Sequence, residues 1–343
     1  MLSVKSCIRI LIAALATCLV AACGGGGGGS SSLPATGVSI TSANAKQVSA
    51  VVVDSVNTVE GATGGAAFLT GVSVTAQASD FNYPDFFVDQ LHRISTLGSL
   101  PNGGSVTGVT IPPTTDSCTL LGGTSGTFTV SGNIDDPPVA GNSITVTYNS
   151  CILGTTILNG SMTINFTQVA GDLVNPPYTM VLTVSLSGFS VTDTVTGLAV
   201  ASSGDMTMSI DEALNGDINL VLSGSSLSSS AAGVTETLSS YVYDILGNDL
   251  SGDFSIDLRG TIASTVIGGS VSFDALAPFM GNDFVFNGNP TAGELHITTS
   301  LDSSQAWVTA QNDGMTVLIE VDLDGDNIVD DTISTTWTEL ENL

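Results

Sequence analysis

From about Gly123 onwards, apolar and polar positions alternate along the chain with a period of two. The polar positions are mostly Ser, Thr, Asn and Asp, so each predicted strand has one apolar and one wet face. Such alternation is typical of an antiparallel sheet with one solvated side. The apolar runs are Phe128-Val130, Ile144-Val146-Tyr148, Met162-Ile164-Phe166, Leu182-Val184-Leu186, Met206-Met208-Ile210, Ile218-Leu220-Leu222, Phe254-Ile256-Leu258, Val271-Phe273, Leu295-Ile297 and Val317-Ile319-Val321.

Turn-forming dipeptides separate these runs at Asn159-Gly160, Asn215-Gly216, Gly247-Asn248 and Asn287-Gly288. Because short turns join neighbouring antiparallel strands, the chain predicts a meander of about a dozen strands. An open sheet of that size curls or closes on itself. We therefore expect a mainly β (α+β) fold in which residues 101–343 form a curled sheet or half-closed barrel.

Residues 38–100 have a different pattern, which predicts two helices. Apolar residues follow helical spacing between Thr41 and Glu60, and Gly61 ends that pattern. A second stripe, Phe87, Leu91 and Ile94, follows Pro84, which suits the first helical position. We expect both helices to pack on the concave apolar face of the sheet, where they either fill the core or leave a cavity.

The first 22 residues read as a secretory signal peptide. Lys5 and Arg9 precede the apolar run Ile10–Val20, which is too short to span a bilayer. The segment ends in Val20-Ala21-Ala22-Cys23, which resembles the lipobox of bacterial lipoprotein precursors. That resemblance implies cleavage before Cys23, diacylation of its sulfur and anchorage to a membrane. The other interpretation is ordinary cleavage after Ala22 with an incidental cysteine.

Residues 23–37 join the lipidation site to the folded part. Gly24–Gly29 and Ser30–Ser32 form a Gly/Ser tether, a composition that behaves as random coil. The residue after Cys23 is Gly rather than Asp, and in enterobacterial lipoproteins that feature favours the outer membrane. We therefore expect a lipid-anchored envelope protein, and whether it faces the periplasm or the exterior stays open.

The cysteine count agrees with export. Cys7 and Cys18 leave with the signal peptide and Cys23 carries lipid, so Cys118 and Cys151 remain. An even pair in an oxidising compartment predicts one disulfide. A two-cysteine metal or redox site is the weaker alternative, because the chain has no C-x-x-C motif and only two histidines.

The charge balance excludes one class of partner. The chain has 32 acidic residues against 5 basic ones and a net charge of −27. Loss of Lys5 and Arg9 with the signal peptide makes that charge more negative by two. Neutralising a phosphate backbone requires clustered Lys and Arg, so we expect no nucleic-acid partner.

One acidic segment, residues 322–330, has the spacing of a metal site. Its sequence DLDGDNIVD resembles the calcium loops of FG-GAP repeats, thrombospondin type 3 repeats and dockerins. That resemblance implies calcium held by the side chains of Asp322, Asp324, Asp326 and Asp330 and by the carbonyl of Ile328. The segment departs from those loops at Asn327, which replaces a Gly, and position 12 is Ile333 rather than the bidentate Glu of an EF-hand. The alternative is a solvated acidic turn between the predicted strands 316–321 and 332–338.

No catalytic motif stands out, so we predict that the protein is not an enzyme. The chain has no G-x-S-x-G motif, and His296 is expected to face solvent by strand alternation. Two functions remain: a structural or interaction module that binds another envelope component, and a carrier of a hydrophobic, lipid-like ligand. The carrier hypothesis is based on a similarity of architecture and address to lipoprotein carriers of the LolA and LolB type.

Overall fold

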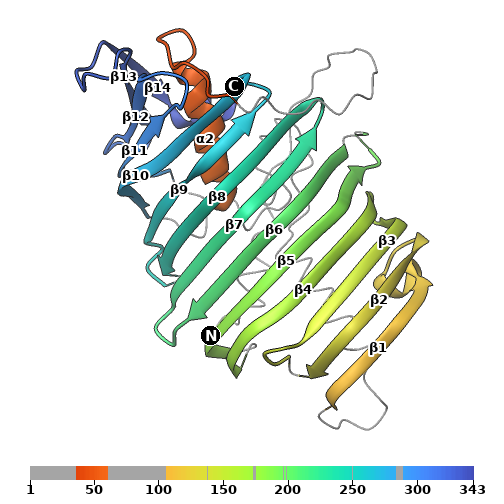
Figure 1. Ribbon diagram of the computed structural model, residues 1–343. Helices are drawn as coiled ribbons and strands as arrows, with labels where there is room; N and C mark the ends of the chain where they lie inside the picture. The colour runs from red at the N-terminus through yellow and green to blue at the C-terminus, as the bar shows by residue number, and fades with distance from the viewer. Residues whose placement is uncertain are drawn as a thin grey trace.

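The computed structural model describes residues 36–60, 106–136, 138–172, 175–195, 197, 199–248, 250–282 and 289–343. Within these residues, fourteen antiparallel strands form a single sheet in which every strand pairs with its neighbours in sequence (Figure 1). The strands are β1 (Val106–Ser117), β2 (Ser125–Asp136), β3 (Ser143–Leu153), β4 (Thr156–Asp172), β5 (Asn175–Asp193), β6 (Ala199–Glu212), β7 (Asp217–Ala231), β8 (Val234–Asn248), β9 (Phe254–Ser264), β10 (Gly269–Gly281), β11 (Ala292–Thr298), β12 (Gln305–Ala310), β13 (Thr316–Asp322) and β14 (Asp331–Thr336).

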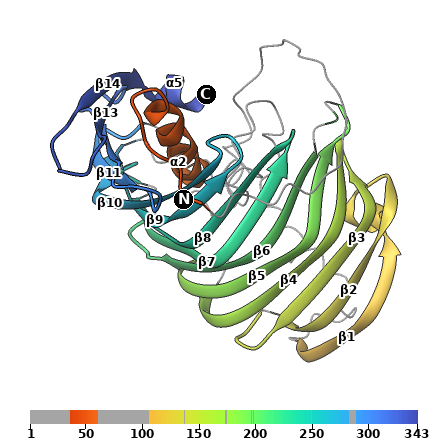
Figure 2. The ribbon, with the colours of Figure 1, turned by 45° about the horizontal axis from the view of Figure 1, so that its top comes forward.

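The sheet curls into an open trough whose edges are β1 and β14 (Figure 2). The prediction of a large, curled antiparallel meander is therefore confirmed. Helix α2 (Ala45–Glu60) lies in the concavity and packs against β9 and β13. Its residues Ala45, Val48 and Val52 are fully buried, which places the helix in the hydrophobic core.

The expectation of two N-terminal helices needs correction. The helix predicted between Thr41 and Glu60 is present as α2, whereas the second one, around Phe87–Ile94, lies outside the described residues. The other described α-helix is C-terminal: α5 (Trp337–Glu341) replaces the end of the strand that was predicted to run to Thr338. The reason is a helix cap, because the Thr336 hydroxyl accepts a 3.1 Å hydrogen bond from the Glu339 amide.

Burial follows the predicted alternation. In β3 the side chains of Ile144, Val146 and Tyr148 are buried, whereas Thr147 between them is exposed. The same register continues into β4, where Met162 and Ile164 are buried opposite Val146 and Ile144. One apolar face thus runs across neighbouring strands.

The opposite, polar face carries rows of hydroxyl and amide side chains. The registers of β2 to β7 align one row across six strands, namely Asn133, Ser143, Asn165, Thr183, Thr207 and Ser223. In the next row, the Thr145 and Thr163 hydroxyls lie 2.9 Å apart and share a hydrogen bond. Such cross-strand pairs are the unit of stabilisation on a solvated sheet face.

Three of the four predicted turns lie in the described residues, with different results. Gly247 and Asn248 are the last two residues of β8 and directly precede its turn to β9. Asn215-Gly216 does form the turn between β6 and β7. Asn159-Gly160 does not form a turn, because both residues lie inside β4, where the registers with β3 and β5 shift. Gly160 has φ +88°, so the dipeptide forms a β-bulge, which needs the same left-handed backbone as a tight turn. Asn287-Gly288 lies outside the described residues.

Strand β1, which the alternation did not reveal, forms one edge of the sheet. Pro112 and Pro113 lie within it, and its register with β2 shifts between Ile111 and Thr114. An edge strand tolerates proline because the backbone N–H that proline lacks is not needed for pairing on the free side of the strand. The missing donor also discourages pairing with another chain. At the other edge, β14 has only six residues and leads directly into α5.

Candidate functional site

The acidic segment 322–330 forms the tip of the β13–β14 hairpin, as predicted. Asp322 is the last residue of β13 and is completely buried, whereas Asp324, Asp326 and Asp330 are exposed. A backbone hydrogen bond of 2.8 Å from the Asp330 amide to the Val321 carbonyl closes the tip. The segment thus combines one buried carboxylate with three exposed ones.

The Asp322 carboxylate organises the loop by accepting backbone hydrogen bonds. Its Oδ1 accepts from the amides of Asp324 at 3.2 Å and Gly325 at 2.7 Å, and its Oδ2 accepts from the Asn327 amide at 2.8 Å. The Gln305 side-chain amide also donates to Oδ2, at 2.8 Å. This donor, followed by the backbone amides, lowers the pKa of Asp322 to about 2 against the opposing effect of desolvation. Asp322 is therefore ionised at neutral pH.

Gln305 belongs to a polar chain on the sheet that sequence reasoning missed. Its Oε1 lies 2.8 Å from Nε2 of His296 on β11, and its Nε2 also donates to Oδ1 of Asn327 at 3.1 Å. The His296 ring stacks on Trp307 with centroids 5.2 Å apart and planes 9° apart. His296 is therefore half-buried and partnered, and the expectation that it simply faces solvent is too coarse.

The structure brings three of the predicted metal ligands together. One carboxylate oxygen from each of Asp322, Asp324 and Asp330 lies within 4.8 Å of the others. Asp326 is not part of this group, and its Oδ1 instead accepts a 2.8 Å hydrogen bond from the Ile328 amide. Three carboxylates in one tight loop have the chemistry that a hard divalent cation such as calcium prefers.

The backbone at the tip takes the conformation that the sequence implied. Asn327, which stands where the calcium loops that this segment resembles have Gly, has φ +64° in the left-handed region. Gly325 also has a positive φ, +81°, and a Cβ atom there would lie 2.7 Å from the carbonyl oxygen of Ser303. The hairpin tip therefore packs directly against the loop between β11 and β12.

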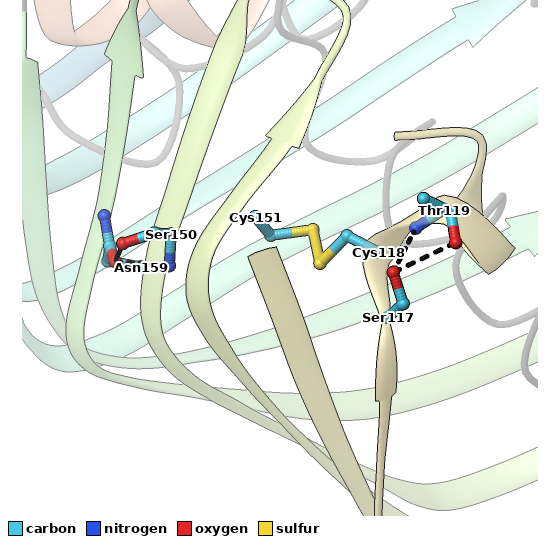
Figure 3. The surroundings of a disulfide bond; sticks show 6 residues. All are labelled: Ser117, Cys118, Thr119, Ser150, Cys151 and Asn159. Atoms are coloured by element: carbon cyan, nitrogen blue, oxygen red, sulfur yellow. Dashed lines mark hydrogen bonds between the residues drawn. A yellow bond between two sulfur atoms is a disulfide. The ribbon is translucent and has the colours of Figure 1, made fainter. Parts of the chain in front are cut away.

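The predicted disulfide is present. Cys118 begins the short 3-10 helix η2 (Cys118–Leu121), Cys151 lies in β3, and both are fully buried with Cα atoms 5.6 Å apart (Figure 3). The bond joins residues on either side of β2. Beside it, Oδ1 of Asn159 accepts a 2.8 Å hydrogen bond from the Ser150 amide, so the β4 bulge and the disulfide lie together.

A small cavity lies between α2 and the middle of the sheet. Its volume is about 10 Å³, the room of about one water molecule. It is lined by Ser55, Met206, Leu222, Leu227, Leu238, Tyr241 and Tyr243. An acyl chain does not fit in this space.

The predicted lipidation site, Cys23, lies outside the described residues. In the part of the chain that is described, no helix has the length and apolarity needed to cross a bilayer. No family model, no curated protein and no solved structure matches this chain. What the protein does is therefore inferred from its own residues.

Proposed function

We propose that the protein is an exported lipoprotein, anchored to the outer membrane through Cys23, whose β domain is a structural or interaction module of the cell envelope. The observation that carries this proposal is the buried Cys118–Cys151 disulfide. Disulfides persist in oxidising compartments and are rare in the cytosol, so this bond supports the export that the signal sequence predicts. The lipobox-like sequence before Cys23 then supplies the anchor.

The polar face of the sheet supports the interaction role. Rows of Ser, Thr and Asn side chains present both donors and acceptors to solvent over at least six strands. A partner that offers complementary polar groups is held there by many weak hydrogen bonds rather than by charge. The alternative role, a carrier of a lipid-like ligand, requires a much larger void than the cavity beside Ser55.

We also propose that the hairpin tip binds calcium and thereby stabilises the β13–β14 edge. Asp322, Asp324 and Asp330 supply the converging carboxylates, and Asp322 is held ionised by its hydrogen-bond donors. Extracellular calcium modules bind in the millimolar range, which suits an exported protein.

Membrane fractionation tests the anchor. The Cys23→Ser variant is expected to leave the membrane fraction, because the acylated sulfur is absent. Cys18→Ser is the matched control, since this residue leaves with the signal peptide and the mature chain is unchanged. Retention of Cys23→Ser in the membrane fraction would overturn the proposal.

Native mass spectrometry of the soluble Cys23→Ser chain then separates the interaction role from the carrier role, because co-purified lipid is expected only for a carrier.

A further inference from the structure

The first described residues, 36–40, contact the sheet at the same end as the acidic hairpin tip, and we call them the N-terminal segment. The Thr36 carbonyl accepts a 3.2 Å hydrogen bond from the Ser270 amide, and the Val38 amide donates a 3.2 Å bond to the Ser270 carbonyl. Ser270 is the second residue of β10, so this contact marks the end of the sheet where β10 begins. β12 and β14 begin at that end too, because alternate strands of an antiparallel meander run in the same direction.

Two close approaches connect this N-terminal segment to the hairpin tip through the loop 299–304. A Cβ atom at Gly37 would lie 2.7 Å from the Leu301 nitrogen, and the Ile40 amide donates a 2.8 Å hydrogen bond to the Ser304 hydroxyl. On its other side, the same loop contacts Gly325 through Ser303. The N-terminal segment, the loop and the hairpin tip are therefore contiguous.

Four large apolar side chains are exposed on this loop and hairpin. Their exposed fractions are 57% for Leu301, 44% for Leu323, 66% for Ile328 and 41% for Val329. We call these four residues the apolar tip. Exposed apolar residues are ordinary and also occur at the opposite end of the sheet, where Leu250 is 78% exposed, so exposure alone does not identify a docking surface.

The tether limits how far this end of the sheet lies from the lipid anchor. Twelve residues lie between Cys23 and Thr36, so the Cα atoms of these two residues are at most about 45 Å apart when that chain is fully extended. The other end of the sheet is farther away, because β7 and β8 each have fifteen residues and a strand of that length spans about 50 Å. The bilayer that holds Cys23 is thus the apolar surface closest to the apolar tip.

The negative charge of the two loops indicates which lipid headgroups they can approach. Asp302 and Asp326, which lie outside the proposed calcium site, are exposed on the same two loops, so anionic headgroups repel this surface. Zwitterionic headgroups bear an ammonium group and no net charge, and they accept both the carboxylates and the apolar side chains. We propose that the apolar tip docks on the zwitterionic phospholipid surface to which Cys23 is anchored, an inference that rests on the proposed lipidation.

A fluorescence experiment on the lipidated full-length mature chain tests this docking. The protein is reconstituted into phosphatidylethanolamine–phosphatidylcholine vesicles with a polarity-sensitive dye on Ile328→Cys. The matched control carries the dye on Leu250→Cys, which is 78% exposed in the turn between β8 and β9, at the opposite end of the sheet. We expect blue-shifted emission and about threefold weaker quenching by neutral acrylamide at position 328 than at position 250, because interfacial burial excludes water and the quencher.

The two possible failures are distinguishable. A chain that floats with the vesicles but shows equal quenching at both positions overturns the docking and leaves the anchor intact. A chain that does not float with the vesicles, and so behaves like Cys23→Ser, overturns the proposed anchor and the docking with it.

Discussion

Gln305 on β12 and Asp322 on β13 lie directly opposite each other in the sheet, and the Gln305 amide donates a 2.8 Å hydrogen bond to the buried carboxylate. The other hydrogen bonds described for Asp322 come from backbone amides of its own loop, so Gln305 ties the acidic tip to the sheet. This pair explains why the loop is ordered around a buried charge, because a buried carboxylate is tolerated only where donors surround it.

The pH dependence of stability follows from this arrangement. The folded-state pKa of Asp322 is lowered to about 2 from an ordinary value of 3.8. The stabilisation that the ionised Asp322 carboxylate gives to the folded state is therefore fully present above about pH 4. It is lost as the pH falls from about 4 to about 2. Urea unfolding over this range should show a steeper loss for the native chain than for Asp322→Asn, which does not titrate. Exposed Asp257→Asn is the control, and equal slopes for the native chain and Asp322→Asn would contradict the account.

Calcium is expected to raise the melting temperature. A ligand that binds only the folded state at about ten times its dissociation constant adds about 1.4 kcal/mol to the free energy of unfolding. Calorimetry with millimolar calcium and with EDTA should show this response in the native chain and in Asp257→Asn. The double variant Asp324→Asn/Asp330→Asn should lose it. Identical melting temperatures for the native chain under both conditions would remove the metal hypothesis.

The β4 bulge predicts a contrast between two glycines. Both Gly154, in the β3–β4 turn, and Gly160 have a positive φ, and the left-handed backbone costs alanine about 1–2 kcal/mol. A Cβ atom at Gly154 has nothing within 4 Å, whereas one at Gly160 collides with the Gly188 carbonyl. Gly160→Ala should therefore destabilise the chain by at least about 1 kcal/mol more than Gly154→Ala. Chemical denaturation measures both, and equal losses would show that the bulge relaxes freely.

Reduction of the disulfide is expected to destabilise the fold. Cys118 and Cys151 are 33 residues apart, and closing a loop of that length contributes about 3–4 kcal/mol in the chain-entropy model. Dithiothreitol should lower the unfolding free energy of the native chain by about this amount. It should have no effect on the double variant Cys118→Ser/Cys151→Ser, which starts from the lower value. An insensitive native chain would show that the bond is dispensable.

The period-two pattern predicted the interior of the sheet because each strand has one buried and one wet face. It failed where local chemistry differs from that rule. Pro112 and Pro113 concealed β1, since proline is unusual except at an edge, and Gly160 was misread because a bulge and a tight turn need the same left-handed residue. The short helix after Thr336 depends on a single cap.

At the candidate site, residues close together in sequence were predictable and distant ones were not. The spacing of Asp322, Asp324 and Asp330 indicated a loop with converging carboxylates, and Asn327 was expected to tolerate the left-handed region. Gln305 was missed because its role depends on the register between β12 and β13, which no local pattern in the sequence specifies.

The central claim, that the chain is a lipid-anchored exported protein, is tested most directly by the mass of its N-terminal peptide. Lys46 is the first basic residue after Cys23, so trypsin releases residues 23–46 as one peptide from the purified membrane-bound protein. The account predicts a peptide that begins at Cys23 and carries the added mass of acyl chains. An N-terminal peptide with an unmodified Cys23, or one that still contains the signal sequence, would contradict it.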